Sequence, residues 1–200
     1  MSTEQVFTEI YRNRKWRLGL PETVSGGGST LAHTEALRSK LPDVFAELDI
    51  KSIFDAPCGD FNWMKEVDLT GIKYIGADVV EELIADLQDK HAKPGIDFVH
   101  ADILEDKIPE VDLWLCRDCL QHFSIEDIFK ALNQLSISNV KYFASTNFPE
   151  IKRNTAINTG GWRELNLLAE PFASILPSPF MIIPDVVFDR PRNLSIWKMK

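Results

Sequence analysis

The stretch of sequence that decides the fold is Ser52-Ile-Phe-Asp55-Ala-Pro-Cys-Gly59-Asp-Phe-Asn-Trp63. Two apolar residues end in an acid, a turn around one glycine follows, and residues 61–67 are amphipathic. This order predicts a buried parallel strand that leads through a tight turn into a helix at about residues 61–67. In an open α/β sheet, ligands bind outside the carboxyl ends of the strands, so this turn is a candidate binding site.

The same layout recurs further along the chain. Tyr74-Ile-Gly-Ala-Asp78 and Phe98-Val-His-Ala-Asp102 each end an apolar run in an acid, and Val111-Asp-Leu-Trp-Leu-Cys116 leads into Arg117-Asp118. The carboxyl ends of parallel strands meet at one edge of a sheet. We therefore expect the acids from successive strands to gather there and form a binding site.

Strand and helix patterns alternate regularly from Ser52 onward. This alternation predicts an α/β fold with a mostly parallel, doubly wound sheet in the order 3-2-1-4-5. Before Ser52, Ser29 or Thr30 can cap the helix that follows it, which we expect to end before Pro42, and Ser124 can cap a later helix. The expected strands are 52–57, 73–78, 96–101, 111–116 and 140–145. The expected helices are 31–41, 61–67, 80–90 and 125–136. The β-rich runs 180–183 and 194–197 predict an antiparallel C-terminal strand pair.

The length of 200 residues suits one domain, residues 1–200. We expect a helical cap with a glycine loop, a cofactor-binding core, a long substrate loop and the terminal strand pair. The glycine loop, Gly26–Gly28, is either a flexible joint or a lid over a ligand. The expected bounds of the four parts are 1–45, 50–145, 146–178 and 179–200.

The composition is that of an ordinary globular protein, with 44% hydrophobic and 26% charged residues. A formal charge of −8 argues against nonspecific binding to nucleic acid or to an anionic membrane, which depends on basic surface. The three cysteines, an odd number, favour reduced thiols. The longest apolar runs are shorter than a membrane span, and the first 25 residues are rich in charge. We therefore expect a cytoplasmic protein.

Residues 52 to about 145 resemble the class I S-adenosylmethionine (SAM)-dependent methyltransferases. The resemblance is closest to a bacterial subset with the motif Asp-x-Pro-Cys-Gly-Asp-Phe, then Cys-Arg-Asp and a late Gly-Trp-Arg. Pro57 and Phe61 stand where the family usually has glycines. The resemblance implies a Rossmann-like methyltransferase fold and SAM as the cofactor.

The strand ends supply the expected cofactor-binding residues. Gly59 has no Cβ, so its backbone can approach the adenosyl group and adopt a positive φ. Asp78 follows Gly59 at the sequence spacing at which, in the dinucleotide-binding fold, a strand-end carboxylate accepts the ribose hydroxyls. The resemblance implies the same role. The resemblance further implies that Asp102 binds the adenine amino group beside Ile103, and that Asp55 binds the methionine amino group through water. The complete expected set is Asp55, Ala56, Gly59, Asp78, Val79, Asp102, Ile103 and Arg117.

An NAD-type dehydrogenase would share this fold. It requires Gly-x-Gly-x-x-Gly after the first strand, because the pyrophosphate binds to backbone N–H groups there. Those glycines are missing, and a sulfonium cofactor has no pyrophosphate. The sequence therefore favours the methyl donor.

Strand four leads into Cys116-Arg-Asp-Cys-Leu-Gln-His122, a turn that should lie near the transferable methyl group. Methyl transfer needs alignment of donor and acceptor, and removal of a proton if the acceptor is a hydroxyl. His122 is the candidate base, with Asp118 orienting it or acting in its place. Alternatively, His122 only packs beside the helix start, and Arg117 only pairs with Asp118. The Cys-x-x-Cys spacing in this turn is found in redox sites, but we expect neither redox nor metal function.

Trp162 and Arg163, inside the long loop, could close over the acceptor or simply anchor the loop in the core. The chain lacks the Asn/Asp-Pro-Pro-Tyr signature of enzymes that methylate amino groups in nucleic acids. We therefore expect O-methylation of a small-molecule or glycan hydroxyl. A non-catalytic SAM-binding partner or regulatory subunit, or an NAD-type dehydrogenase, remains an alternative.

Overall fold

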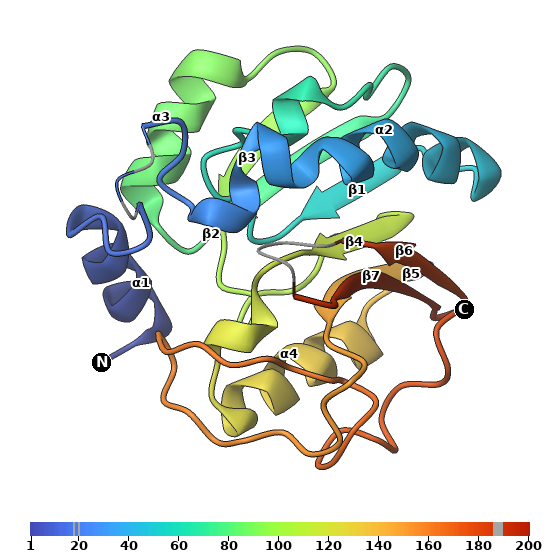
Figure 1. Ribbon diagram of the computed structural model, residues 1–200. Coiled ribbons are helices and arrows are strands. Elements are labelled where there is room, and N and C mark those ends of the chain that lie inside the picture. Colours follow the sequence, from blue (N-terminus) through green and yellow to red (C-terminus); the bar gives the residue numbers. More distant parts are fainter. Residues whose placement is uncertain (18, 20, 186–189) are drawn as a thin grey trace. The chain divides into compact units, whose positions relative to one another are not determined.

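The computed structural model describes residues 1–17, 19, 21–185 and 190–200. It falls into two compact units, Met1–Asp102 (unit 1) and Ile103–Lys200 (unit 2) (Figure 1). The single domain and its four expected parts stay predictions, and the last part includes residues 186–189, which lie outside the described residues.

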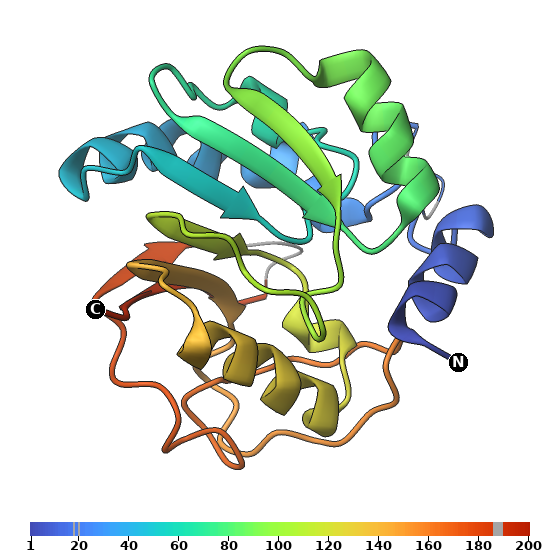
Figure 2. The same ribbon diagram turned by 180° about the vertical axis from the view of Figure 1, so that it is seen from behind.

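Unit 1 contains the first parallel strands. The strands β1 (Ser52–Asp55), β2 (Lys73–Asp78) and β3 (Ile96–His100) lie in the order β3-β2-β1. Figure 1 shows α2 in front of these strands, and Figure 2 shows the strands in front of α2, so the helix covers one face of this part of the sheet. The helices of the unit are α1 (Thr3–Arg12), α2 (Leu31–Glu47) and α3 (Glu81–His91).

The expected helix over residues 61–67 is wrong, because only the 3-10 turn Met64–Glu66 forms there. Phe61 has a φ of +57°, in the left-handed region, which no right-handed helix can include. Its ring packs 5.2 Å from Tyr74 and 5.1 Å from Phe98, measured between ring centroids. Packing against these two strands thus overrides the helical pattern of the sequence.

The helix α2 begins as predicted but ends later. The Thr30 hydroxyl accepts the N–H of His33, which confirms the predicted cap. The helix then continues through Pro42 to Glu47, so the expected end at residue 41 is wrong. Buried side chains lie on both sides of the proline, and their packing offsets its missing hydrogen bond; they are Leu37, Leu41, Val44 and Phe45.

Unit 2 has parallel and antiparallel strands in the order β4-β5-β7-β6. The pair β4 and β5 is parallel, whereas β7 is antiparallel to both β5 and β6, so the predicted C-terminal strand pair is confirmed. Helix α4 (Ile125–Ile137) begins after Ser124, whose hydroxyl accepts the N–H of Asp127 at 3.1 Å. The strands are β4 (Leu113–Cys116), β5 (Tyr142–Asn147), β6 (Met181–Pro184) and β7 (Asn193–Lys198).

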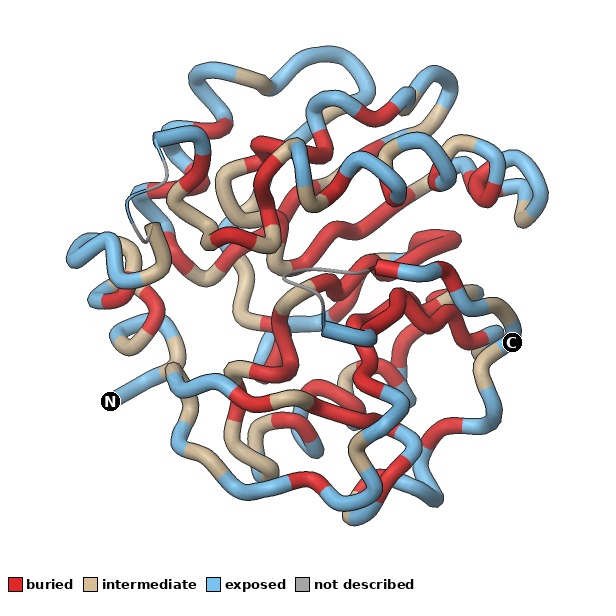
Figure 3. The backbone as a smooth tube through the Cα atoms, viewed as in Figure 1, coloured by how far each residue is buried: buried red, intermediate tan, exposed pale blue. Residues whose placement is uncertain are grey.

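Buried residues concentrate along the strands of each unit (Figure 3). In unit 2 the rings of Trp114, Phe143 and Trp197 pack in series, with centroids 5.1 and 5.7 Å apart. The long loop before β6 is ordered by Asn154, whose side chain donates to the carbonyl of Asn166 and accepts its N–H, both at 2.8 Å. None of the described helices is long and apolar enough to cross a membrane.

Candidate functional site

Acids from all three strands of unit 1 lie at one edge. Asp55 and Asp78 end β1 and β2, and their residues are only 2% and 8% exposed. Asp102 follows β3 by two residues and is half-buried. The N–H of Ala101 donates to the backbone carbonyl of Asp78 at 3.1 Å, so the chain leaving β3 stays beside the end of β2. The edge thus carries the carboxylates that the sequence pattern assigns to it.

The Asp78 carboxylate is held by backbone groups. One oxygen accepts the N–H of Val80 at 3.0 Å, and the other accepts the N–H of Gly59 at 3.3 Å. Burial raises the pKa of Asp78 to about 6, against the opposing effect of these N–H donors. Since each carboxylate oxygen has two lone pairs, each can accept a further hydrogen bond. Two adjacent hydroxyls, as in a ribose, fit this acceptor pair.

The neighbouring predicted residues have different surroundings. Asp55 accepts the hydroxyl of Tyr74 at 2.6 Å, and burial, together with the Asp55 charge, raises the pKa of Tyr74 well above its usual value. Ala56 is fully buried behind the turn, and Val79 is half-buried. Asp55 therefore already has one fixed donor, whereas Asp78 is held by main-chain donors that belong to the turn itself.

The segment before α2 is hydrogen-bonded onto the turn after β1. The Asp60 carboxylate accepts the Thr23 hydroxyl and the Val24 N–H, both at 2.7 Å, and the Asp60 N–H donates to the Ser25 hydroxyl at 2.8 Å. Gly59 has a φ of +54°, and a Cβ added there would lie 2.5 Å from the Ser25 hydroxyl oxygen. The glycine therefore makes room for this segment.

A buried network of charges follows β4 in unit 2. Arg117 donates from Nε and Nη2 to the two carboxylate oxygens of Asp185, at 3.0 Å each, and also pairs with Asp118 at 3.2 Å. Arg192 bridges the same two acids, with 2.9 Å to Asp185. Arg117, which the sequence analysis places in the cofactor site, thus has its guanidinium in ion pairs with these carboxylates.

Asp118 is held in place and is ionised near neutral pH. Its backbone has a φ of +53°, and its N–H donates to the Thr146 hydroxyl at 2.9 Å. Burial alone would raise the pKa of Asp118, but the charges of Arg117 and Arg192 outweigh it and hold that pKa well below its usual range. A general base must accept a proton near neutral pH. This environment favours a positioning role for Asp118 over proton transfer.

The structure brings His122 together with the glycine, tryptophan and arginine of the long loop. The Gly160 N–H donates to the His122 carbonyl at 2.8 Å, and the Arg163 N–H donates to the Gln121 carbonyl at 3.1 Å. The His122 ring nitrogen Nδ1 lies 2.8 Å from the Gly161 carbonyl. Residues 160–163 thus run beside residues 121–122, although about forty positions separate them in the sequence.

The contact with Gly161 determines which ring nitrogen of His122 carries the proton. A carbonyl can only accept, so Nδ1 donates, and in the neutral ring Nε2 is the acceptor nitrogen. Burial lowers the pKa of His122, the Gly161 hydrogen bond and the Asp118 charge oppose this, and the Arg163 charge lowers the pKa further. The imidazole is therefore neutral near pH 7, with a lone pair on Nε2, which is the form that acts as a general base.

Trp162 and Arg163 point to different environments. Trp162 is 47% exposed, its ring meets Phe148 edge-on, and the Arg190 guanidinium lies 4.7 Å from its centroid. Arg163 is 4% exposed and donates from Nη1 to the Phe123 carbonyl at 2.6 Å. Arg163 therefore anchors the loop, whereas Trp162 offers a face to a ligand. Ile103, at the start of unit 2, is buried.

Sequence reasoning missed Asp185 and Arg192. Asp185 directly follows β6 and Arg192 directly precedes β7, and they lie 68 and 74 positions from their partners Arg117 and Asp118. The only local signal is that a proline precedes each of them. A charge beside a proline in a β-rich run usually indicates a solvated turn, so the pattern gave no reason to expect burial.

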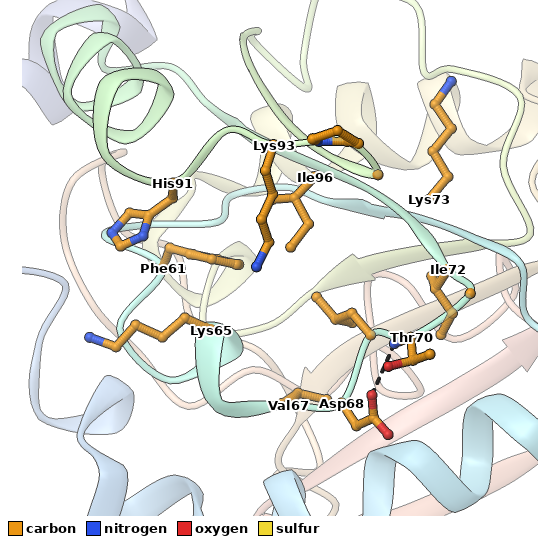
Figure 4. Close-up of a pocket in the computed structure, with 14 residues that line it drawn as sticks. Phe61, Lys65, Val67, Asp68, Thr70, Ile72, Lys73, His91, Lys93 and Ile96 are labelled. Atoms are coloured by element: carbon orange, nitrogen blue, oxygen red, sulfur yellow. Dashed lines mark hydrogen bonds between the residues drawn. The ribbon is translucent and has the colours of Figure 1, made fainter.

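A cavity of about 690 Å³ opens at the opposite edge of unit 1, where β2 and β3 begin (Figure 4). Lys65, His91 and Lys93 surround it together with Phe61, and the Asp68 carboxylate accepts the Thr70 N–H at 3.0 Å. Cations dominate this cavity, whereas adenosine hydroxyls and a sulfonium call for acceptors and negative charge. It is therefore not the candidate site.

Two comparisons of the sequence with known proteins gave different results. Residues 53–137 match the family of the methyltransferase domain. No curated protein sequence matches the chain.

Solved structures share the fold at low sequence identity. Magnesium protoporphyrin IX methyltransferase from Synechocystis PCC 6803, with bound S-adenosylhomocysteine (SAH), has a TM-score of 0.68, 11% identity and full coverage of both chains (100%). The 1,6-didemethyltoxoflavin-N1-methyltransferase of Burkholderia thailandensis, also with SAH, has a TM-score of 0.67 and 16% identity, over 98% of this chain and 86% of that one. Human N-acetylserotonin methyltransferase, with SAM, has a TM-score of 0.66 and 16% identity over 99% of this chain, which spans only 60% of that enzyme.

These enzymes share the α/β, Rossmann-like arrangement of the strands described above. The fold class predicted from the sequence is confirmed. With residues 53–137 matching a methyltransferase domain, the predicted enzyme class, a methyltransferase, is confirmed as well.

Proposed function

We propose that the protein is a SAM-dependent methyltransferase that methylates a hydroxyl of a small-molecule or glycan acceptor. The observation that carries the choice of a hydroxyl is His122, a neutral imidazole whose Nδ1 is fixed by the Gly161 carbonyl. An alcohol must lose its proton as it is methylated, so it needs such a base, whereas an unprotonated amine can attack directly.

Unit 1 supplies most of the cofactor-binding residues, and Ile103, at the start of unit 2, completes the set. Asp78 accepts the two ribose hydroxyls, one on each carboxylate oxygen, and the turn at Gly59 lies against the adenosyl group. Asp102 and Ile103 bind the adenine, and Asp55 binds the methionine amino group. When bound, SAM supplies a methyl group activated by its positively charged sulfur. Ala56 and Val79 complete the binding surface through their backbone.

Unit 2 supplies the proton acceptor. Nε2 of His122 takes the proton of the acceptor hydroxyl, the oxygen forms its new bond to the methyl carbon, and the carbon–sulfur bond breaks with its electron pair left on sulfur. Asp118 stays ionised near neutral pH, and its charge favours the protonated imidazole that this step produces. Arg117 holds Asp118 in place through the shared ion pairs.

Two measurements test this function in order. Calorimetry with SAH tests cofactor binding, and the absence of binding would end the proposal. Transfer of label from methyl-labelled SAM is then measured on paired acceptors, small hydroxylated compounds and oligosaccharides, against their amine counterparts. We expect label on hydroxyl acceptors only. SAH binding without transfer to any of these acceptors would instead support the non-catalytic SAM-binding subunit, and transfer to amines alone would remove the assignment of His122 as base.

A further inference from the structure

Arg163 is a buried cation with unsatisfied donors. Only Nη1 has an acceptor, the Phe123 carbonyl, while Nε and Nη2 are buried without a hydrogen-bond partner in the described part of the chain. The residue is 4% exposed. Buried polar groups in native proteins are almost always hydrogen-bonded, and a buried charge is almost always paired. The two orphaned donors therefore call for an acceptor from outside the described part of the chain.

The orphaned donors form one edge of the guanidinium. Nε and Nη2 point in parallel, and this edge binds a carboxylate through two hydrogen bonds. Arg117 shows this arrangement in the same unit, since its Nε and Nη2 each donate to an oxygen of Asp185 at 3.0 Å. Arg117 has its carboxylate inside the chain. Arg163 presents the same edge, and none of the described residues supplies a carboxylate to it.

The groups around Arg163 do not neutralise it. Burial alone lowers the pKa of Arg163, and none of the described acids offsets it. The adjacent acid, Glu164, pairs with Arg190 at 3.1 Å, and Arg190 in turn lies over the Trp162 ring. The charge of Arg163 acts on His122, whose pKa it lowers. The orphaned edge thus belongs to the same part of unit 2 as the proposed base.

We propose that Arg163 binds a carboxylate group of the acceptor through Nε and Nη2 and so holds that acceptor beside His122. This inference rests on the function proposed above and narrows the acceptor to hydroxy acids, among which are glycans that carry an acidic sugar. The carboxylate of the methionine part of SAM has the same chemistry and is the competing source.

The test uses binding, so it does not depend on knowing the natural acceptor. 4-Hydroxybenzoate and 4-hydroxybenzamide have the same shape and differ in charge, and calorimetry measures both on the full chain with SAH present. The variants are Arg163→Met and Arg163→Lys. Arg153→Met is the matched control, because Arg153 lies in the same loop but is exposed.

We expect 4-hydroxybenzoate to bind about 10- to 100-fold more tightly than the amide, as two hydrogen bonds to a charged donor predict. Arg163→Met should remove this preference, Arg163→Lys should retain part of it, and Arg153→Met should leave it unchanged. SAH affinity, which also reports that Arg163→Met is folded, should stay within about twofold of the native value.

Two results would overturn the inference. Equal binding of the acid and the amide to the native protein would show that no carboxylate is recognised. Alternatively, Arg163→Met could weaken SAH while leaving 5′-methylthioadenosine, which lacks the amino-acid part, unaffected. That result would assign the edge to the cofactor. If the native protein does not bind SAH at all, that separate outcome would refute the proposed function.

Discussion

Replacing Asp78 by asparagine should stabilise the protein and weaken its binding of SAM, two effects of opposite sign. The pKa of Asp78 is about 6, compared with 3.8 for an unburied aspartate, because burial disfavours the charged form. Above pH 6 the folded protein therefore holds a carboxylate that the unfolded chain would ionise more easily. Asparagine keeps the shape and one acceptor oxygen, so it loses one of the two backbone hydrogen bonds, but it has no charge to bury.

The size of the stabilisation follows from the pKa difference. A shift of one pKa unit corresponds to about 1.4 kcal/mol, so the burial of this charge lowers the free energy of unfolding by at most about 3 kcal/mol above pH 6. Between pH 3.8 and 6 the folded state binds more protons than the unfolded state, so native stability falls as the pH rises through this interval. Below pH 3.8 both states are protonated and the penalty vanishes.

Urea unfolding of the native protein and of Asp78→Asn at pH 4 and pH 7.5 measures this effect. The advantage of the variant should be large at pH 7.5 and small at pH 4. In calorimetry, SAH should bind Asp78→Asn about 10- to 100-fold more weakly, since one hydrogen bond to a charged acceptor is lost. A variant that is equally destabilised at both pH values, and binds SAH normally, would refute both the burial argument and the ribose assignment.

Three further predictions concern His122, Asp185 and Gly59. His122→Ala should lower methyl transfer about 100- to 10,000-fold with SAH affinity unchanged, and normal turnover by the variant would remove the base assignment. The activity of the native protein should fall at acid pH, where the imidazole gains its proton. Asp185→Asn leaves Arg117 without its main counter-charge and should cost about 3–5 kcal/mol in urea unfolding; a loss below about 1 kcal/mol would show that the network is not structural. Gly59→Ala should lower the free energy of unfolding by about 1–2 kcal/mol because of the positive φ, and further because of a clash with the Ser25 hydroxyl. Adding Ser25→Gly should remove only the part due to the clash, as thermal unfolding of both variants would show.

The order of strands and helices could be predicted because it depends on local patterns. Apolar runs that end in acids indicate β1 and β2 within a few residues, and the Ser124 cap indicates the start of α4. The expectation failed where distant partners decide the backbone. Phe61 leaves the helical region because its ring packs on strands that are remote in the sequence, and α2 passes through Pro42 because both of its halves are buried.

The same distinction applies to the candidate site. Acids at strand ends are local features, so the sequence could propose Asp78 as a candidate from its spacing to Gly59. The environment that sets the chemistry of each group is not local. Asp118 and His122 are four positions apart, yet ion pairs with Arg117 and Arg192 hold one ionised while burial keeps the other neutral. The two proposed roles, positioning for Asp118 and base for His122, therefore could not be separated from the sequence.

Two arginines of unit 2 show why burial alone does not identify a functional residue. Arg117 and Arg163 are both buried, and a buried guanidinium is costly unless a carboxylate compensates it. For Arg117, Asp185 supplies that carboxylate, so the residue stabilises the fold and has little left to offer a ligand. For Arg163, none of the described residues supplies a carboxylate to compensate the buried charge, and protein stability alone gives no reason to retain that charge. A charge kept at such a cost is more readily explained by a ligand that arrives with its own carboxylate.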